Sequence, residues 1–186
     1  MKFLLVGLGN IGEEYKYTRH NIGFLVLDRM VNKYQTEFKS GKLADTATFR
    51  IKNKVVTAIK PTTYMNLSGK AYRYWLEQLD VPVEQSMAVV DELALQFGTI
   101  RIKTKGSSGG HNGLASIEQE LKTTAYARLR FGIGNSFSKG KQIDYVLGKW
   151  SDEEVKALPE LLDKTILAIE ESILSGFSNA MNKFNG

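Results

Sequence analysis

The sequence predicts a single three-layer α/β domain of residues 1–186, in which helices flank a mixed, mostly parallel β-sheet. Three observations lead to this fold class. Strand-like and helix-like patterns alternate along the 186 residues. The clearest hairpin lies near Asn53, so part of the sheet is antiparallel. No linker, repeat or low-complexity segment divides the chain, which favours one domain at this length.

The strands are predicted from short apolar or alternating segments. Residues 2–6 are predicted to form a buried strand, because the segment is continuously apolar after Lys2 and ends at glycine. Two further strands joined at Asn53 are expected at residues 49–51 and 55–59. Another short apolar strand ends at Asp91. Alternating apolar and polar residues predict half-buried strands at 99–104 and 128–131.

The helices are predicted from apolar residues at helical spacing. We expect helices at residues 21–38 and 113–121, with a glycine-rich loop over 105–113 between strand and helix. Ser68 is the expected cap of a helix that carries apolar residues at Tyr72, Trp75, Leu76 and Leu79.

The last predicted helix begins with a capping-box pattern of Ser151 and Glu154. Pro159 is expected to split or kink this helix. Its inward positions are Val155, Leu158, Leu161, Leu162, Ile166, Ile169 and Ile173.

The composition excludes several classes of protein. There is no cysteine, which excludes disulfides, thiolate catalysis and cysteine-bound zinc. No window reaches the roughly 18 consecutive apolar residues that span a bilayer. The first apolar segment is interrupted at Gly7, unlike a signal peptide, so we expect a cytoplasmic protein. The net charge of +5 fits either a polyanionic partner such as nucleic acid or a slightly basic surface.

The segment from Gly7 to Gly12 matches the GxGxxG pattern of dinucleotide-binding enzymes. In those enzymes the glycine turn leads directly into a helix whose N-terminus meets the pyrophosphate. Here Glu13 and Glu14 follow the turn, and their charges would repel phosphate. A nicotinamide-dependent enzyme therefore remains only a minor alternative. The other interpretation is a tight turn that directs Asn10 into a site at the end of the first strand.

His20 is the best candidate for a catalytic residue. It lies in a polar segment between the glycine turn and the first helix, and histidine exchanges protons near neutral pH. Asp91, at the end of a buried strand, is the carboxylate best placed to orient the ring. The alternative for Asp91 is a helix or turn cap.

Three asparagines, Asn10, Asn66 and Asn112, follow strands or begin helices. Their amides suit recognition of peptide groups or polarisation of a carbonyl oxygen, although each alone also suits a turn. His111 is expected to belong to hydrogen bonds within its own loop. With two histidines far apart in sequence and no HExxH motif, we expect no metal site.

Basic residues alternate on two predicted strands. Arg101, Lys103 and Lys105 share one face, and Arg128 and Arg130 share another. Side by side, the two strands would form a platform for phosphate groups. The alternative is an ordinary solvated strand face.

Several long motifs resemble those of bacterial peptidyl-tRNA hydrolases, in family order over essentially the whole chain. The most specific are GLGN at residues 7–10, TRHNIG at 18–23, KPTTYMNLSG at 60–69, GGHNGL at 109–114, RLRFGIG at 128–134, YVLG at 145–148 and AMNKFN at 180–185.

The resemblance implies an enzyme that cleaves the ester between a peptide and the 3′-terminal ribose of tRNA, as a cytoplasmic monomer without metal, cofactor or obligate protein partner. It implies that His20 activates water, that Asp91 keeps His20 able to accept a proton, and that Asn10 helps to recognise N-blocked substrates. Residues implied in contacts with the tRNA end, the peptide or tRNA phosphate are Tyr15, Tyr64, Met65, Asn66, Asn112, Lys103 and Arg130.

The sequence also departs from the family pattern at four positions. Ile11 and Gln96 replace common prolines, Ala94 replaces a common aspartate, and Asn135 stands where a basic residue is frequent. None of them is a residue to which chemistry is assigned. A non-catalytic RNA-binding protein of the same fold remains the alternative function.

Overall fold

A seven-stranded sheet in the order β2-β3-β4-β1-β5-β7-β6 runs through the protein. The computed structural model describes residues 1–186. Because β3 and β6 run antiparallel to their neighbours, the other five strands point in one direction. The strands are β1 (Lys2–Gly7), β2 (Lys39–Ser40), β3 (Ala44–Ile51), β4 (Lys54–Pro61), β5 (Ser86–Glu92), β6 (Ile100–Lys103) and β7 (Ala127–Gly132).

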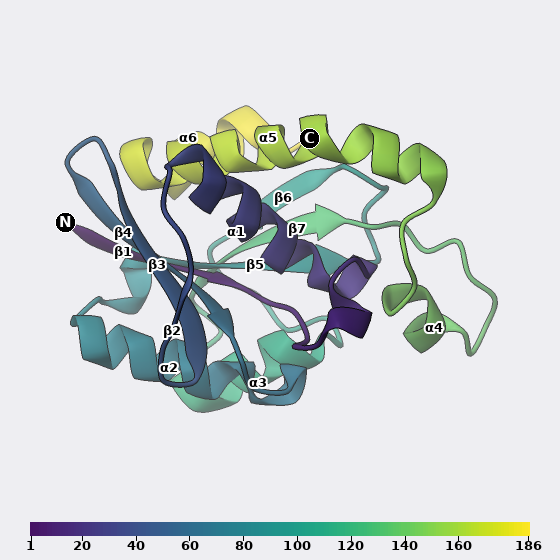
Figure 1. Ribbon diagram of the computed structural model, residues 1–186, viewed down its shortest axis with the longest axis horizontal. Coiled ribbons are helices and arrows are strands. Elements are labelled where there is room, and N and C mark those ends of the chain that lie inside the picture. The colour runs from purple at the N-terminus through teal and green to yellow at the C-terminus, as the bar shows by residue number, and fades with distance from the viewer.

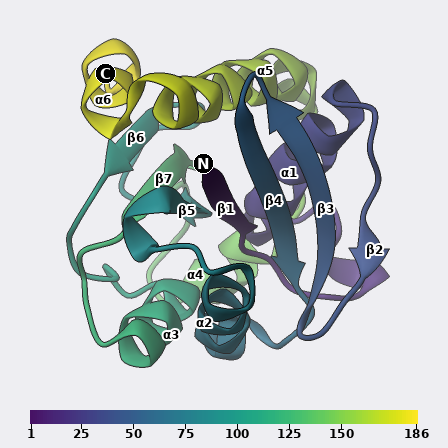
Figure 2. The same cartoon turned by 90° about the vertical axis from the view of Figure 1, so that its left-hand side faces the viewer.

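Helices cover both faces of this sheet, so the predicted three-layer α/β fold is confirmed. Figures 1 and 2 show α1, α5 and α6 on one face and α2 and α3 on the other. The helices are α1 (Ile22–Lys33), α2 (Ser68–Leu79), α3 (Asn112–Leu121), α4 (Gln142–Val146), α5 (Asp152–Ser175) and α6 (Phe177–Phe184). Short 3₁₀ helices are η1 (Glu13–Tyr15), η2 (Arg19–Asn21), η3 (Met65–Leu67) and η4 (Val83–Gln85). No helix is both long enough and apolar enough to cross a membrane.

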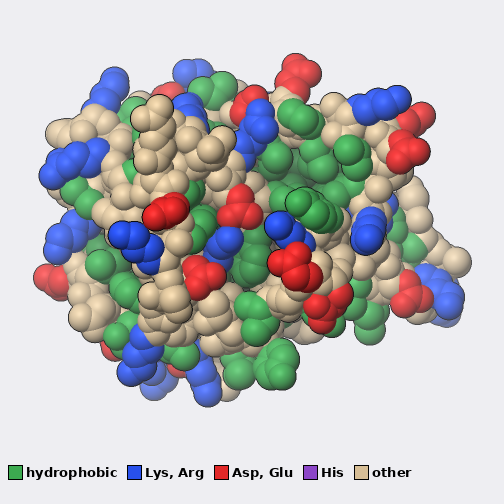
Figure 3. All heavy atoms as spheres, in the orientation of Figure 1, with side chains coloured by type: hydrophobic (Ala, Val, Ile, Leu, Met, Phe, Trp, Pro, Cys, Tyr) green, Lys and Arg blue, Asp and Glu red, His purple; other side chains and the backbone are tan.

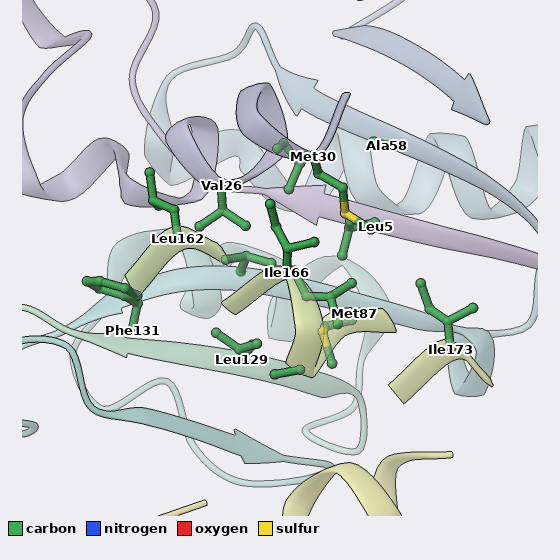
Figure 4. Close-up of a cluster of buried hydrophobic side chains, with 14 of the residues drawn as sticks. Leu5, Val26, Met30, Ala58, Met87, Leu129, Phe131, Leu162, Ile166 and Ile173 are labelled. Carbon is green, nitrogen blue, oxygen red and sulfur yellow. The ribbon is translucent and has the colours of Figure 1, made fainter. Parts of the chain in front are cut away.

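Each face of the sheet has its own apolar core, because successive side chains of a strand point to opposite faces. Leu5 and Leu129 belong to the core beneath α1 and α5, and Figure 4 shows them beside Val26 and Ile166. Leu4 and Val6 belong to the core beneath α2 and α3. The central strands are thus buried on both faces, which explains their continuously apolar sequences.

The predicted hairpin at Asn53 is correct, and its strands are longer than expected. Ala44 pairs with Pro61 at one end of the β3–β4 ladder, and Ile51 pairs with Lys54 at the other. The two turn residues are Lys52 and Asn53, and Lys52 has a φ of 53°. Tight two-residue hairpin turns need a residue with positive φ, and here Lys52 adopts that conformation although it is not glycine.

The first helix was predicted to reach Phe38, but α1 ends at Lys33. Gln35 adopts a left-handed conformation, and the amide of Thr36 donates to the carbonyl of Val31. This hydrogen bond closes a Schellman motif, which glycine usually forms. The apolar periodicity continues because Tyr34 and Phe38 still pack against the core. Without a glycine or proline, the sequence contained no stop signal.

The predicted helix caps were partly wrong. Ser68 is the first residue of α2, and its hydroxyl donates to the carbonyl of Met65 instead of accepting from the helix. The capping box of Ser151 and Glu154 is confirmed. Pro159 does not split α5, which is continuous, and Val155 is 53% exposed and so points away from the core.

The predicted basic platform is also partly wrong. Strands β6 and β7 do lie side by side, with Lys103 opposite Arg128. However, Arg128 is fully buried, and its guanidinium donates to the carbonyls of Gly106, Thr124 and Tyr126. A buried arginine that fixes loop carbonyls cannot also bind phosphate. The exposed Lys103 and Lys105 remain available, whereas the side chain of Arg130 is only 12% exposed and donates to Glu92.

Arg128→Met should therefore destabilise the fold by about 2 kcal/mol or more, because hydrogen bonds to charged groups are worth about 1.5–3 kcal/mol each. Urea unfolding measures the effect. Arg101→Met is the matched control on the neighbouring strand, and a change within about 0.5 kcal/mol is expected there. Unchanged stability of Arg128→Met would contradict this structural role.

Candidate active site

Two histidines and one aspartate meet at the carboxyl edge of the sheet. His20 lies in η2, Asp91 lies at the end of β5, and His111 immediately precedes α3. The Nδ1 atom of His20 is 2.9 Å and 3.0 Å from the two carboxylate oxygens of Asp91. The Nε2 atom of His111 is 2.9 Å from Oδ1 of Asp91. Asp91 thus lies between the two rings, as predicted for His20 but not for His111.

The hydrogen bonds define the tautomers of both rings. Nδ1 of His111 accepts from the backbone amides of Gly113 and Leu114, at 3.1 Å and 3.3 Å. That nitrogen therefore carries no proton, and Nε2 of His111 is the donor to Asp91. Nδ1 of His20 also donates to Asp91, which leaves Nε2 of His20 as the basic atom. This nitrogen has no hydrogen-bond partner in the protein.

Sequence reasoning missed this role of His111. It was expected to bond within its own loop, and its Nδ1 does bond locally, to the first amides of α3, which it caps. Its other ring nitrogen reaches Asp91, which is distant in sequence. Only the GGHNGL motif of the resembled family singled out this position, and the sequence contains no signal for the contact itself.

The electrostatics of the pair follow from its burial. Burial lowers the pKa of His20, but the charge of Asp91 and its hydrogen bond to the ring together outweigh this effect and raise the pKa above 6.5. Burial would raise the pKa of Asp91, which is 5% exposed. The two histidines outweigh burial there too, and the pKa of this carboxyl lies far below its usual range.

A tight turn after β1 places His20 over the edge of the sheet. Gly23 at the start of α1 packs on the end of β1, and a Cβ there would lie 2.5 Å from the backbone nitrogen of Leu8. The side chain of Asn21 accepts from the amide of Asn10 at 2.8 Å and donates to its carbonyl at 2.9 Å. These contacts hold η2 and the Asn10 turn together. The structure also argues against a dinucleotide-binding turn at residues 7–12. Such a turn leads directly into a helix, whereas η1 and η2 separate β1 from the first α-helix here.

A pocket of about 210 Å³ opens beside the two histidines. Asn112 lies on its wall, as do Gly109 and Gly110 from the glycine-rich loop. The opposite wall comes from α4, through Gln142, Ile143 and Val146. The pocket thus exposes one side of the His20–Asp91 pair.

The three predicted asparagines do not share one hollow. Asn112 lines the His20 pocket, whereas Asn10 lines a neighbouring polar groove that also contains Ile11 and Lys60. Asn66 is exposed on η3. Asn112 therefore lies beside the catalytic candidate, whereas Asn10 is joined through hydrogen bonds to Asn21, the residue after His20.

The remaining predicted contact residues differ in accessibility. Tyr64 is 74% exposed, and Tyr15 is half-buried in η1. Met65 is 7% exposed and packs in the core beneath α2 and α3, so the structure gives it little surface to contact a substrate. Arg130 donates to Glu92 and to the carbonyl of Ser107, both at 3.0 Å, and Glu92 lines the His20 pocket.

The expectation of no metal site rested on the sequence separation of the histidines, and folding removes that separation. The ligand atoms of His20, Asp91 and His111 lie within 4.8 Å of one another. These are atoms that a transition metal can use. A metal ion there would have to replace the two protons that the rings donate to Asp91.

A buried carboxylate that orients a histidine beside an open pocket is the arrangement of general base catalysis. Fold and site together define an α/β protein in which a histidine paired with a buried carboxylate lines an open pocket. A family model described as "Peptidyl-tRNA hydrolase" matches residues 4–186. The chain belongs to the peptidyl-tRNA hydrolase family.

Individual relatives agree with this assignment. The chain is 51% identical to a peptidyl-tRNA hydrolase of Parabacteroides distasonis, covering 100% of this chain and 99% of that protein. It is 41% identical to that of Bacillus subtilis, covering 98% and 97%. The crystal structure of peptidyl-tRNA hydrolase from Acinetobacter baumannii superposes with a TM-score of 0.92 at 33% identity, covering 99% of this chain and 94% of that one. The non-catalytic alternative is not favoured.

NMR titration of His20 checks the electrostatics of the site. The pKa of His20 should lie above 6.5, because Asp91 stabilises the protonated ring. In Asp91→Asn the charge is lost while burial remains, so the His20 pKa should fall below its wild-type value. Asp163→Asn, at an exposed ion pair on α5, is the control that should leave it unchanged. A His20 pKa that does not respond to Asp91→Asn would contradict this coupling.

Proposed function

We propose that this protein hydrolyses the ester between a peptide, or an N-blocked amino acid, and the 3′-terminal ribose of tRNA. The reaction releases free tRNA for reuse in translation and ribosome rescue. The observation that carries the proposal is the unpartnered Nε2 of His20, held in its basic tautomer by Asp91 beside an open pocket. Family membership over residues 4–186 supplies the substrate class.

In the proposed mechanism, Nε2 of His20 removes a proton from a water molecule as its oxygen attacks the ester carbonyl. The resulting imidazolium is stabilised by Asp91, which is already deprotonated. The tetrahedral intermediate then expels the ribose 3′-oxygen, and His20 returns the proton to it. The products are a carboxylic acid and an alcohol, and no covalent enzyme intermediate is needed.

His111 acts on this reaction through Asp91. Its ring donates to Oδ1 while the N-terminal amides of α3 hold its other nitrogen. The carboxylate therefore cannot rotate freely away from His20. General base catalysis typically contributes about 10²–10⁴-fold, and positioning and oxyanion stabilisation supply the remainder.

Amide groups on either side of His20 are the proposed substrate contacts. Asn112, inside the pocket, is placed to polarise the carbonyl or to bind the tRNA end. Asn10 contacts the blocked amino group from the neighbouring groove, and the exposed Tyr64 and Asn66 extend the contact surface. Tyr15 completes this set from η1.

The tRNA backbone is proposed to lie over β6 and β7, where Lys103 is exposed and Arg130 would exchange its contact with Glu92 for one with phosphate. The exposed glycines of the adjoining loop, Gly109 and Gly110, add backbone amides at the pocket wall. On the face over α1 and α5, acidic and basic side chains are interspersed (Figure 3), so that face lacks the uniform charge that suits a polyanion.

We also propose that residues 1–186 work as one domain, as a monomer in the cytoplasm. One sheet carries Asp91 and the basic strands, and His20 contacts Asp91 at the edge of that sheet. Sedimentation of the purified protein would measure its mass.

His20→Ala should lower kcat for cleavage of N-acetyl-aminoacyl-tRNA by about 10²–10⁴-fold, because it removes the proposed general base. tRNA binding and the unfolding midpoint should be preserved. Release of acid-soluble amino acid measures the reaction, with unblocked aminoacyl-tRNA as the substrate control. Unimpaired turnover by this variant would exclude His20 as the base.

Lys103→Ala should raise KM for the same substrate and leave kcat nearly unchanged, because a phosphate contact is lost from both the ground state and the transition state. The slope of log KM against log salt should decrease by about one. Lys164→Ala, an exposed lysine on α5, is the matched control. Equal effects of the two substitutions would rule out a specific contact on β6.

A further inference from the structure

Arg19 precedes the proposed base directly and joins three elements of the site. Its Nη1 donates to the carbonyl of Tyr145 in α4 at 3.2 Å, and its Nη2 lies 2.8 Å from Oε1 of Glu154 in α5. The guanidinium carbon lies 4.2 Å from the centroid of the Tyr145 ring and 5.8 Å from that of Trp150. Arg19 thus connects η2, which carries His20, with the segment that forms the pocket wall.

Backbone contacts continue the connection between these segments. The amide of Arg19 donates to the carbonyl of Gly148, and Thr18 forms an antiparallel bridge with Lys149. Gly148 leaves room for the guanidinium, since a Cβ there would lie 3.0 Å from Nη1 of Arg19. The same Cβ would also lie 3.0 Å and 3.1 Å from the carbonyl oxygens of Asp144 and Tyr145, so the backbone is closely packed here as well.

Helix α4 needs such support. It has only five residues and no side-chain cap, and isolated helices of this length are unstable. Apart from Arg19, it is held by Tyr145, whose hydroxyl donates to the carbonyl of Ile133 at 2.6 Å, and by Val146, which packs against the core. Yet α4 contributes Gln142, Ile143 and Val146 to the His20 pocket, and Ile143 is 71% exposed there.

Stability alone accounts poorly for this arginine. Its side chain is 12% exposed, and Nε is buried without a hydrogen-bond partner. An unsatisfied buried donor costs stability, and a buried ion pair is often no more stabilising than apolar residues of similar volume. Glu154 would still complete its capping box without Arg19, because it also accepts from the amide of Ser151.

We propose that Arg19 is a positioning residue, which holds the α4 wall of the pocket at a fixed distance from His20 and so determines how tightly the substrate is bound. The proposal rests on the proposed hydrolysis at this pocket. Arg19 does not contact the His20 ring, and its side chain acts on the substrate only through α4.

The test compares Arg19→Met with wild type on N-acetyl-aminoacyl-tRNA. KM should rise about tenfold with kcat within about twofold, because a displaced wall weakens ground-state and transition-state binding alike. The acid limb of the pH–rate profile should not move. Arg19→Lys should recover only part of the loss, since one ammonium cannot reach both Glu154 and the Tyr145 carbonyl as the guanidinium fork does.

Arg29→Met is the matched control. Arg29 also joins an N-terminal helix to α5, through Asp163 at 2.6 Å and 3.0 Å, but far from the pocket. Unchanged KM in a folded Arg19→Met variant, or an equal rise in both variants, would overturn the proposal.

Hydrogen exchange gives a readout that does not depend on activity. In Arg19→Met, deuterium uptake should rise at residues 142–148 and stay unchanged at 166–175. Unchanged uptake at 142–148 would overturn the positioning role even where KM changes. If wild type fails to cleave the substrate, the proposed function fails, while this exchange measurement still tests the link between Arg19 and α4.

Discussion

The site depends on one buried carboxylate, that of Asp91. A charge removed from water is costly unless hydrogen bonds replace its hydration. Here two imidazole rings replace it, one on each side, and the pKa of Asp91 falls although burial alone would raise it. The same contacts determine which nitrogen of each histidine carries the proton. The position of one charge thus sets both the stability of the site and the basicity of His20.

The fold brings these groups together because the sheet is largely parallel. Strands β1 and β5 are neighbours and end at the same edge, so the turn after β1 and the carboxyl end of β5 meet there. The packing of α3 against the same edge adds the N-terminal amides that hold His111. Arg19 then attaches the pocket wall to η2. Four segments far apart in the chain supply one pocket, and each is held by hydrogen bonds to another.

The two arginines of β7 have different roles in this protein. Arg128 and Arg130 are two residues apart on β7, yet one is buried among carbonyls and the other reaches the edge of the pocket. Alternation along a strand places both side chains on the same face of the sheet. They differ because the loop that contains Gly106 covers Arg128 and accepts its hydrogen bonds. A net charge of +5 therefore overstates the basic surface available to tRNA.

The sequence alone determined most of the fold. Apolar periodicity located the strands and most helices, the polar segment before the first helix indicated His20, and the end of a buried strand indicated Asp91 as its partner. It missed the end of α1, because Gln35 closes the helix without glycine, and it misjudged Ser68 and Arg128, whose partners come from other segments. Only the tertiary structure revealed that His111 completes the Asp91 site and that Arg19 reaches α4 and α5. Periodicity reports which face of an element is buried, whereas hydrogen bonds between distant segments depend on how those elements pack together.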